Sequence, residues 1–199
     1  MKKILIATKN KDKFVIVVDI FKKIGLQNYE FVNLHDLSID DNIEETGDIT
    51  QRAEQKAKFY GNIAKKLSIA GLVAIIGIDD GIKLPKNDNA NPNSKEITSG
   101  ILSGELVEKG DIVWIVRAFV IYVLETGKIV SSTTLIPFNF LGNSEDVKWM
   151  DEKYPLSLVL GRVNDFKPVA EISNKESSDY YLKYSKYPLQ EMFVKASVL

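Results

Sequence analysis

The first half of the chain alternates short apolar runs with longer segments whose apolar residues recur at helical spacing. Apolar runs at residues 3–8, 29–34 and 72–78 predict strands, the first and last of them buried. Apolar residues recur at near-helical spacing in segments 10–25 and 48–67, which predicts a helix in each. The order strand, helix, strand, helix, strand is typical of an α/β fold whose sheet is largely parallel.

Polar residues at the helix ends indicate where these helices begin and stop. Asn10 is a suitable N-cap for the first helix, and Gly25 a suitable residue just beyond its C-terminus. Asp48, followed three residues later by Gln51, fits a capping box. The second helix should therefore begin near Ile49.

The second half has a different pattern. Long β-type segments at 112–136 are joined at Glu125–Lys128, which predicts an antiparallel hairpin. The Asn- and Pro-rich stretch 84–96 predicts a long mobile loop. Residues 175–196 should form a closing helix. Pro188 is expected either to interrupt this helix or to begin one of its turns.

Composition limits the classes of function. The 199 residues, 45% of them hydrophobic, suffice for one compact domain with a sizeable core. The 26 basic and 27 acidic residues give a net charge of -1, which does not favour a nucleic-acid partner. The chain has no cysteine and one histidine, His35, so thiolate chemistry and multi-histidine metal sites are excluded. Any metal would be a hard ion held by carboxylates, such as Mg²⁺.

Targeting signals also bear on the class of protein. The N-terminus lacks the apolar segment of a signal peptide. The longest apolar run, 69–78, is far shorter than the roughly 20 residues that span a bilayer. We therefore expect a soluble, cytoplasmic protein that does not enter a membrane.

One candidate site lies between the first strand and the first helix. Backbone N–H groups at the start of a helix suit a phosphate, which Thr8 and Asn10 could also bind through their side chains. Lys13 could add a full positive charge. The alternative is that Asn10 only caps the helix and that the lysines here are solvated.

Acidic residues form two further candidate sites. Asp79 and Asp80 follow the third apolar run, and a carboxylate there could bind a divalent metal or act as a base toward water. The alternative is an Asp-Gly turn that ends the strand. Glu44, Glu45 and Asp48 precede the second helix, where they could bind metal or simply complement the helix dipole. Together with the phosphate site, they favour Mg²⁺ plus a polyphosphate as the ligand.

These motifs resemble those of the inosine triphosphate pyrophosphatase family, the RdgB-like enzymes. Thr8, Asn10 and Lys13 match the family's (T/S)xNxxK signature, and residues 44–47 match its EETG motif. Lys56-Ala57 matches a Lys-Ala pair on the following helix, and Asp79-Asp80-Gly81 resembles a shortened DDSG motif. The resemblance covers residues 1 to 82 well, with a weaker similarity in "RAFVIYVL".

The second half departs from the family. Neither an FGYDP motif nor a Ser-His-Arg motif is recognisable there, and the family recognises the purine base with those regions. "AEIS" at 170–173 is similar to the segment that precedes Ser-His-Arg, and only 181–183 or 185–187 could occupy that motif's place. The serine after the paired aspartates is missing, and Gln51-Arg52-Ala53 replaces the family's Glu-Asn-Ala.

The resemblance implies an α/β fold with a mixed twisted sheet, flanking helices and two lobes around a central cleft. Residues 1–199 would form a single domain. One lobe, at about 1–82 plus the C-terminal helix, would hold the phosphate and metal site. The second, antiparallel lobe would comprise about residues 97–165. Family members are usually dimeric, so a homodimer is expected.

The resemblance also implies roles for individual residues. Glu45 and Asp80 would ligate Mg²⁺, with Asp79 nearby, and Asp80 would be the general base for a water that attacks the α-phosphorus. Thr8, Asn10 and Lys13 would stabilise the pyrophosphate, and Lys56 would lie within reach of the phosphates.

The implied activity is Mg²⁺-dependent hydrolysis of non-standard purine nucleoside triphosphates, such as ITP, XTP and dITP, to the monophosphate and pyrophosphate. Because the base-recognition motifs are missing, we expect an altered or relaxed base preference. Two alternatives remain open. The chain could be a nucleotide-binding homologue with weakened catalysis, or a Maf-like pyrophosphatase that prefers pyrimidines.

Overall fold

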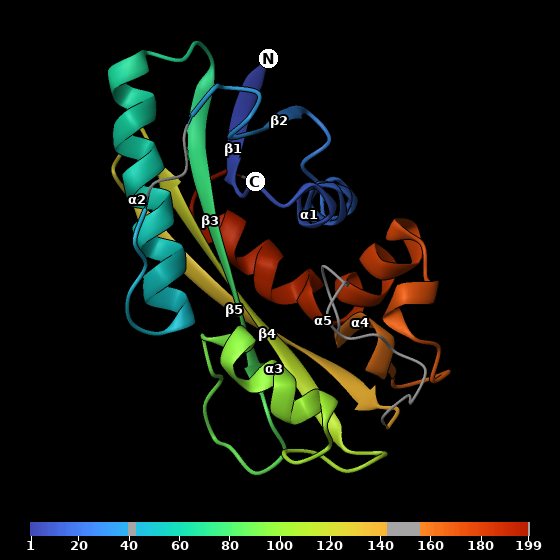
Figure 1. Cartoon of the computed structure of the whole chain (residues 1–199). Coiled ribbons are helices and arrows are strands. Elements are labelled where there is room, and N and C mark those ends of the chain that lie inside the picture. The colour runs from blue at the N-terminus through green and yellow to red at the C-terminus, as the bar shows by residue number, and fades with distance from the viewer. Residues whose placement is uncertain (40–42, 143–155, 199) are drawn as a thin grey trace.

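The computed structural model describes residues 1–39, 43–142 and 156–198. Its strands and helices alternate in the first half and are ordered as shown in Figure 1. The strands are β1 (Lys2–Ala7), β2 (Tyr29–Asn33), β3 (Leu72–Lys83), β4 (Ile112–Val123), β5 (Ile129–Phe140) and β6 (Leu160–Arg162). The helices are α1 (Lys11–Lys23), α2 (Ile49–Leu67), α3 (Ser94–Leu102), α4 (Leu156–Val159), the 3₁₀ turn η1 (Val169–Glu171) and α5 (Asn174–Lys195).

All six strands belong to one mixed sheet, in the order β2-β1-β3-β4-β5-β6. β1 pairs in parallel with β2 and β3, as the alternation of strands and helices predicted. β3, β4, β5 and β6 pair antiparallel, and β4 and β5 form the predicted hairpin. The α/β fold with a mixed sheet and flanking helices is therefore confirmed.

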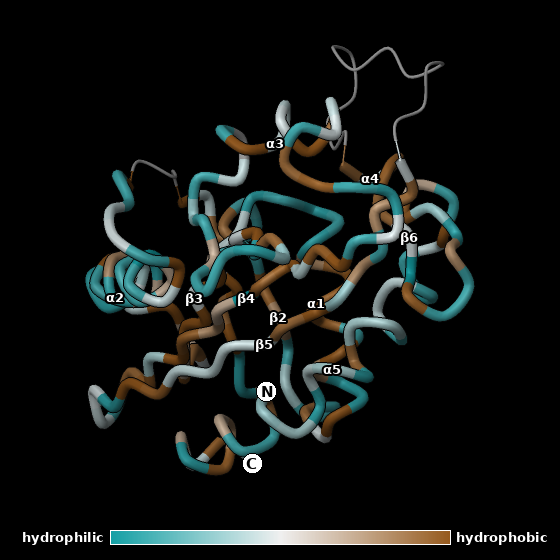
Figure 2. Tube along the Cα trace, turned by 90° about the horizontal axis from the view of Figure 1, so that it is seen from below, coloured by the Kyte–Doolittle hydropathy of each residue, from teal (hydrophilic) through white to brown (hydrophobic). Residues whose placement is uncertain are grey.

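Helices cover both faces of the sheet. α2 lies on one face, and α1 and α5 lie on the other (Figure 1). α2 approaches β3 so closely that a Cβ on Gly77 would lie 1.9 Å from the carbonyl oxygen of Ala53. Only glycine permits this approach. Figure 2 shows hydrophobic positions concentrated along the central strands, whereas the surface of α2 is largely hydrophilic.

The caps of α1 and α2 agree with the sequence-based prediction. The Asn10 side chain accepts a hydrogen bond from the backbone N–H of Lys13, 3.0 Å away. Asp48 and Gln51 form the complete capping box. Gly25 follows the first helix with a φ of 123°, a conformation that glycine adopts without a steric penalty. Both helix starts are therefore set by local sequence.

Three expectations need correction. β3 does not end before Asp79 but continues to Lys83, because β4 pairs with it along its whole second half. Pro188 does not interrupt α5, since Leu189, Met192 and Phe193 beyond it are buried in the core and hold the helix in place.

The third correction concerns the predicted loop 84–96. Its last residues belong to α3, and Asn91 forms an antiparallel bridge with Ile82. Parts of two other predicted segments lie outside the described residues. These are 40–42, in the polar, acidic connection 36–48 expected before the second helix, and 143–155 of the predicted second lobe. In the described part of the chain, no helix has both the length and the apolar character needed to cross a membrane.

Candidate active site

The turn between β1 and α1 places the first set of predicted residues. The Thr8 hydroxyl accepts a hydrogen bond from the backbone N–H of Asn10, at 3.2 Å. Asn10 uses its side-chain oxygen as the helix cap, and its side chain lines a cavity. Lys9 and Lys11 are exposed, as expected for solvated lysines. Asn10 therefore acts as a cap, and its place on the cavity wall is compatible with ligand binding as well.

Lys13, Asp80 and Arg117 form a charged cluster beside this turn. Arg117 donates from Nε to Oδ1 of Asp80 at 2.7 Å and from Nη2 to Oδ2 at 3.0 Å. Lys13 Nζ lies 2.9 Å from Oδ2 of the same carboxylate. The register of β3 and β4 places Arg117 directly opposite Asp80. One partly buried carboxylate is thus shared by two cations, which leaves a net positive charge.

This environment alters the ionisation of both partners. Burial opposes the charged form of Asp80, but Arg117 and Lys13 outweigh it and hold its pKa well below the ordinary value. Burial likewise opposes the charge on Arg117. The attraction of Asp80 is stronger than this effect of burial, so the pKa of the guanidinium is raised. The carboxylate therefore stays ionised, and a proton on it is disfavoured as long as both cations remain in place.

Tyr181 of α5 covers the guanidinium. The Arg117 Cζ lies 4.8 Å from the centre of the Tyr181 ring, a distance typical of a cation–π contact. Arg117 is 6% exposed, and its Nη1 is buried without a hydrogen-bond partner in the described part of the chain. Burial raises the pKa of the Tyr181 phenol, so this hydroxyl remains neutral.

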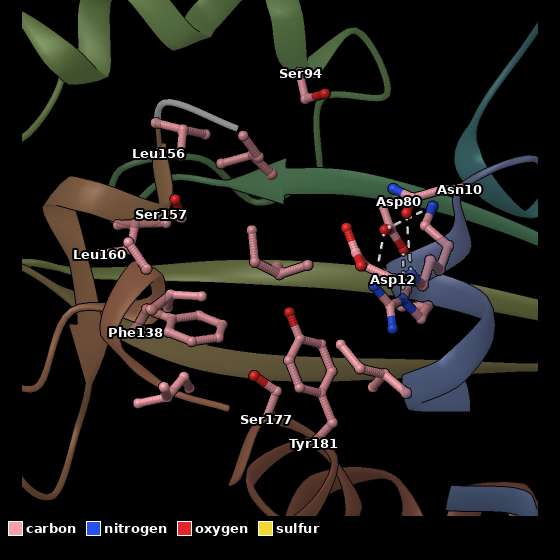
Figure 3. A pocket seen from close by; sticks show the side chains of 18 of the residues that line it. Asn10, Asp12, Asp80, Ser94, Phe138, Leu156, Ser157, Leu160, Ser177 and Tyr181 are labelled. Atoms are coloured by element: carbon pink, nitrogen blue, oxygen red, sulfur yellow. Dashed lines mark hydrogen bonds and ion pairs between the residues drawn. The ribbon is translucent and has the colours of Figure 1, made fainter. Parts of the chain in front are cut away.

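A cavity of about 400 Å³ extends from the charged cluster. Figure 3 shows Asn10, Asp12 and Asp80 at one end, Phe138 and Leu160 toward the other, and Tyr181 between them. The apolar wall also includes Ile16, Ile82, Ile115, Leu156, Val169 and Ile172. A charged end joined to a largely apolar end suits a ligand that carries an anionic group and a flat, weakly polar ring.

The second set of predicted residues lies on the other face of β3. Lys56 of α2 binds Asp79 Oδ1 at 2.7 Å and Glu45 Oε2 at 2.8 Å. It also donates to the Ile78 carbonyl at 3.1 Å. Burial lowers the pKa of Lys56, but Asp79 and Glu45 outweigh this effect and raise it overall. Lys56 therefore remains a cation between two carboxylates.

The two clusters face opposite sides of one strand because neighbouring strand residues point in opposite directions. Asp79 points toward α2, and Asp80 points toward α1 and α5. The pairing of β1 with β3 ends at Ala7 and Gly77, so Asp79 and Asp80 lie beyond the end of β1. At this level the β1–α1 turn, rather than a strand, borders β3. A phosphate chain bound at this edge could therefore approach both faces.

The carboxylates beside Lys56 offer oxygen donors to a metal ion. Glu45 and Asp79 supply oxygen ligands, and Asp79 Oδ2 is buried without a partner in the described chain. Oxygen donors of this kind fit a hard cation such as Mg²⁺. The third predicted ligand, Asp80, is not with them, and the described residues include no group of three metal-binding side chains. The structure thus brings together Glu45 with Asp79, but not all three carboxylates.

Sequence reasoning missed Arg117, Ser177 and Tyr181. Arg117 carries a recognisable signal, because it is the single charged residue in the twelve-residue apolar strand β4. A lone charge in such a strand requires a buried partner. Ser177 and Tyr181 carry no such signal, although Tyr181 begins one of the two segments considered for base recognition. Their role depends on where α5 packs.

Comparisons with known proteins were made by sequence and by structure. No protein-family model and no curated protein sequence matches the chain. A HAM1 protein from Coxiella burnetii has a similar structure, with a TM-score of 0.62 and 14% identity over 99% of this chain and 98% of that one. A nucleoside-triphosphatase / dITP/XTP pyrophosphatase from Mycobacterium abscessus has a TM-score of 0.51 and 15% identity over 89% of this chain and 90% of that one. The chain therefore has the fold of the HAM1 and dITP/XTP pyrophosphatase structures.

Proposed function

We propose that the chain is a nucleoside triphosphate pyrophosphatase. It would hydrolyse non-standard purine nucleoside triphosphates to the monophosphate and pyrophosphate. The observation that carries this proposal is the cavity in which Lys13, Asp80 and Arg117 form a charged end beside a helix N-terminus and an apolar end follows. The similarity of the fold to the Mycobacterium abscessus pyrophosphatase supports it.

In this proposal the phosphates bind at the β1–α1 turn. Thr8, Asn10 and Lys13 would contact phosphate oxygens, together with backbone N–H groups at the start of α1. Lys13 would move its charge from Asp80 to the phosphate, which would leave Arg117 as the remaining cationic partner of that carboxylate. Lys56 would approach the phosphates from the other face of β3.

Once Lys13 has turned to the phosphate, Asp80 would orient the water that attacks the α-phosphorus. Arg117 would keep holding the carboxylate in place, because it binds both oxygens from the neighbouring strand. The water would lose its proton to Asp80 as the bond to phosphorus forms and the bond to pyrophosphate breaks. Positive charge from Lys13 would stabilise the leaving pyrophosphate.

Glu45 and Asp79 would hold Mg²⁺ in the loaded enzyme. The sequence resemblance implied Glu45 and Asp80, but Asp79 lies on the side of Glu45 and has a free oxygen. The ion would neutralise charge on the triphosphate. A homodimer and a cytoplasmic location remain part of the proposal.

A specific observation favours a second candidate, a nucleotide-binding protein with weakened catalysis. Both oxygens of Asp80 already have cationic partners, so the base must be released before it can act. Pyrophosphate release from ITP, XTP, dITP, ATP and pyrimidine triphosphates in the presence of Mg²⁺ separates the candidates. Release from purine triphosphates supports the proposal, and nucleotide binding without release supports the second candidate. A preference for pyrimidines would indicate the Maf-like alternative.

A further inference from the structure

Arg52, on the first turn of α2, connects two segments that are far apart in the chain. Its Nε donates to the carbonyl oxygen of Gly47 at 3.0 Å. Its Nη1 donates to the carbonyl oxygen of Pro92 at 3.3 Å, and its Nη2 donates to Oδ1 of Asn93 at 2.7 Å. The guanidinium presents its donors in a planar fork, so one side chain can hold both segments in a fixed relation. All three acceptors are uncharged, so Arg52 serves as a hydrogen-bonded bridge between the segments.

The first segment is the acidic connection that carries Glu45. Gln55 of α2 holds the neighbouring Thr46 from two sides, since Oε1 accepts from its backbone N–H at 3.0 Å and Nε2 donates to its carbonyl oxygen at 3.1 Å. Arg52 holds the next residue, Gly47, in the same way through its carbonyl oxygen. The position of Glu45, a proposed metal ligand, is thus set by contacts with the first turns of α2.

The second segment lies at the edge of β3, and we call its residues 91–93 the strap. Asn91 forms an antiparallel bridge with Ile82, with N···O distances of 3.0 and 2.8 Å. β1 pairs with the same edge of β3 only as far as Gly77. Asp79 and Asp80 lie between these two points, where the described chain places no strand on this edge. The strap therefore closes the far end of the opening in which the phosphates are proposed to bind.

Asn93 forms its contact with Arg52 in place of an ordinary helix cap. It occupies the N-cap position of α3, where an asparagine usually accepts a hydrogen bond from the backbone of its own helix. Its side chain makes no such bond, and Oδ1 accepts from Arg52 instead. The next residue, Ser94, lines the cavity, and Figure 3 shows it on the side away from Tyr181. Arg52 thereby fixes the start of α3 and this part of the cavity wall.

We propose that Arg52 is a positioning residue, which keeps the segment of Glu45 and the cavity wall at Ser94 in place for a Mg²⁺-bound nucleoside triphosphate. This inference rests on the proposed function of the site. Without the bridge, both segments would have to be ordered as the nucleotide binds, and this ordering would lower the affinity. No hydrogen bond or ion pair joins Arg52 to Asp80 or Arg117 in the described part of the chain. Its loss should therefore weaken substrate binding more than it slows the chemical step.

The residue type at this position also distinguishes the chain from the family it resembles. The family's Glu-Asn-Ala motif has an asparagine where this sequence has Arg52. An asparagine amide offers one nitrogen as a donor, whereas the guanidinium uses three. The bridge between the two segments is therefore a feature of this chain's own sequence.

Kinetics and binding of ITP with Mg²⁺ test the role of Arg52 in the full chain. Arg52→Ala should raise both KM and the dissociation constant by about tenfold and change kcat by less than about threefold. Arg52→Lys keeps the charge but not the planar fork, so it should resemble Arg52→Ala. Lys58→Ala, at an exposed position of the same helix, is the matched control and should behave like the unaltered chain. A fall in kcat with unchanged KM, or normal affinity in Arg52→Lys, would overturn the inference.

Amide hydrogen exchange tests the bridge without any need for turnover. In Arg52→Ala, the amides of 44–48 and 91–94 should exchange faster, whereas those of β1 should remain protected. Should faster exchange in β1 show that this variant unfolds, Asn93→Ala removes the same bridge with α2 unaltered and should give the same pattern. Unchanged exchange in both segments would overturn the inference and leave the proposed function intact. If the unaltered chain bound ITP without releasing pyrophosphate, the proposed function would fail, and the dissociation constants would still test Arg52.

Discussion

Arg117 binds both carboxylate oxygens of Asp80, its direct cross-strand partner, at 2.7 and 3.0 Å. This pairing joins the last strand of the parallel half to the first strand of the antiparallel half. It also fixes the carboxylate that we propose to act on water. In the proposed function, stability and catalysis would both depend on this ion pair.

Replacing Arg117 with methionine should destabilise the fold. The substitution leaves Asp80 charged and partly buried with Lys13 as its remaining partner. We expect a loss of about 2–4 kcal/mol in the free energy of unfolding, below the upper range for fully buried pairs because Asp80 is partly exposed. Urea unfolding measures it. Arg162→Met, which removes a solvent-exposed pair with Asp165, should leave the free energy of unfolding nearly unchanged. Equal stability of Arg117→Met and the unaltered chain would contradict the prediction.

Acid should remove part of this stability. The pKa of Asp80 is lowered in the folded chain, because Arg117 and Lys13 outweigh the burial that opposes ionisation. The contribution of the Asp80 carboxylate to the free energy of unfolding is therefore complete above the ordinary pKa of about 3.9. It is lost as the pH falls toward the lower pKa of the folded state. The difference in unfolding free energy between the unaltered chain and Asp80→Asn should be constant near neutral pH and shrink below about pH 4. If the difference in unfolding free energy does not change with pH, ionisation of Asp80 does not contribute to the stability of the fold.

Local sequence predicted much of the first half. The caps at Asn10 and Asp48 depend on residues within three positions, and the strands and helices between them follow from hydrophobic spacing. The length of β3 could not be predicted in this way. The sequence Asp79-Asp80-Gly81 looks like the end of a strand. The strand continues because β4 pairs with its backbone and because Lys56 and Arg117 neutralise the two carboxylates.

The candidate site was predictable only in part. Lys13 and Asp80 are in contact, as two motifs on one sheet edge suggested. The alternation of neighbouring strand residues separates Asp79 from Asp80, and it groups Asp79 with Glu45 instead. The role of Arg117 depends on the register of β3 and β4, and that of Tyr181 depends on the packing of α5. Neither relation can be derived from spacing along the chain.

Lys13→Ala should weaken nucleotide binding. The lysine supplies the mobile positive charge at the phosphate end, and a charge-assisted contact of this kind corresponds to about ten- to a hundredfold in the dissociation constant. Titration calorimetry with ITP measures it. Lys11→Ala removes an exposed lysine from the same turn and should leave binding unchanged. Equal affinities of the two variants for ITP would show that Lys13 does not contact the phosphates.

Lys56→Met should make the thermal stability of the fold more dependent on Mg²⁺. Without the lysine, Glu45 and Asp79 face each other as like charges, and a cation between them becomes more favourable. We expect Mg²⁺ to raise the Tm of this variant by about 2–4 °C more than that of the unaltered chain. Lys58→Met, at an exposed lysine of the same helix, is the control. The same Mg²⁺ effect in all three proteins would argue against a metal site at Glu45 and Asp79.

The products formed from ITP with Mg²⁺ by the unaltered chain and by Asp80→Asn test the proposed pyrophosphatase activity. We expect inosine monophosphate and pyrophosphate from the unaltered chain. Turnover should be at least about a hundredfold slower in Asp80→Asn, which should still bind ITP. Orthophosphate and a diphosphate as products, or an unchanged rate in Asp80→Asn, would contradict the proposed function.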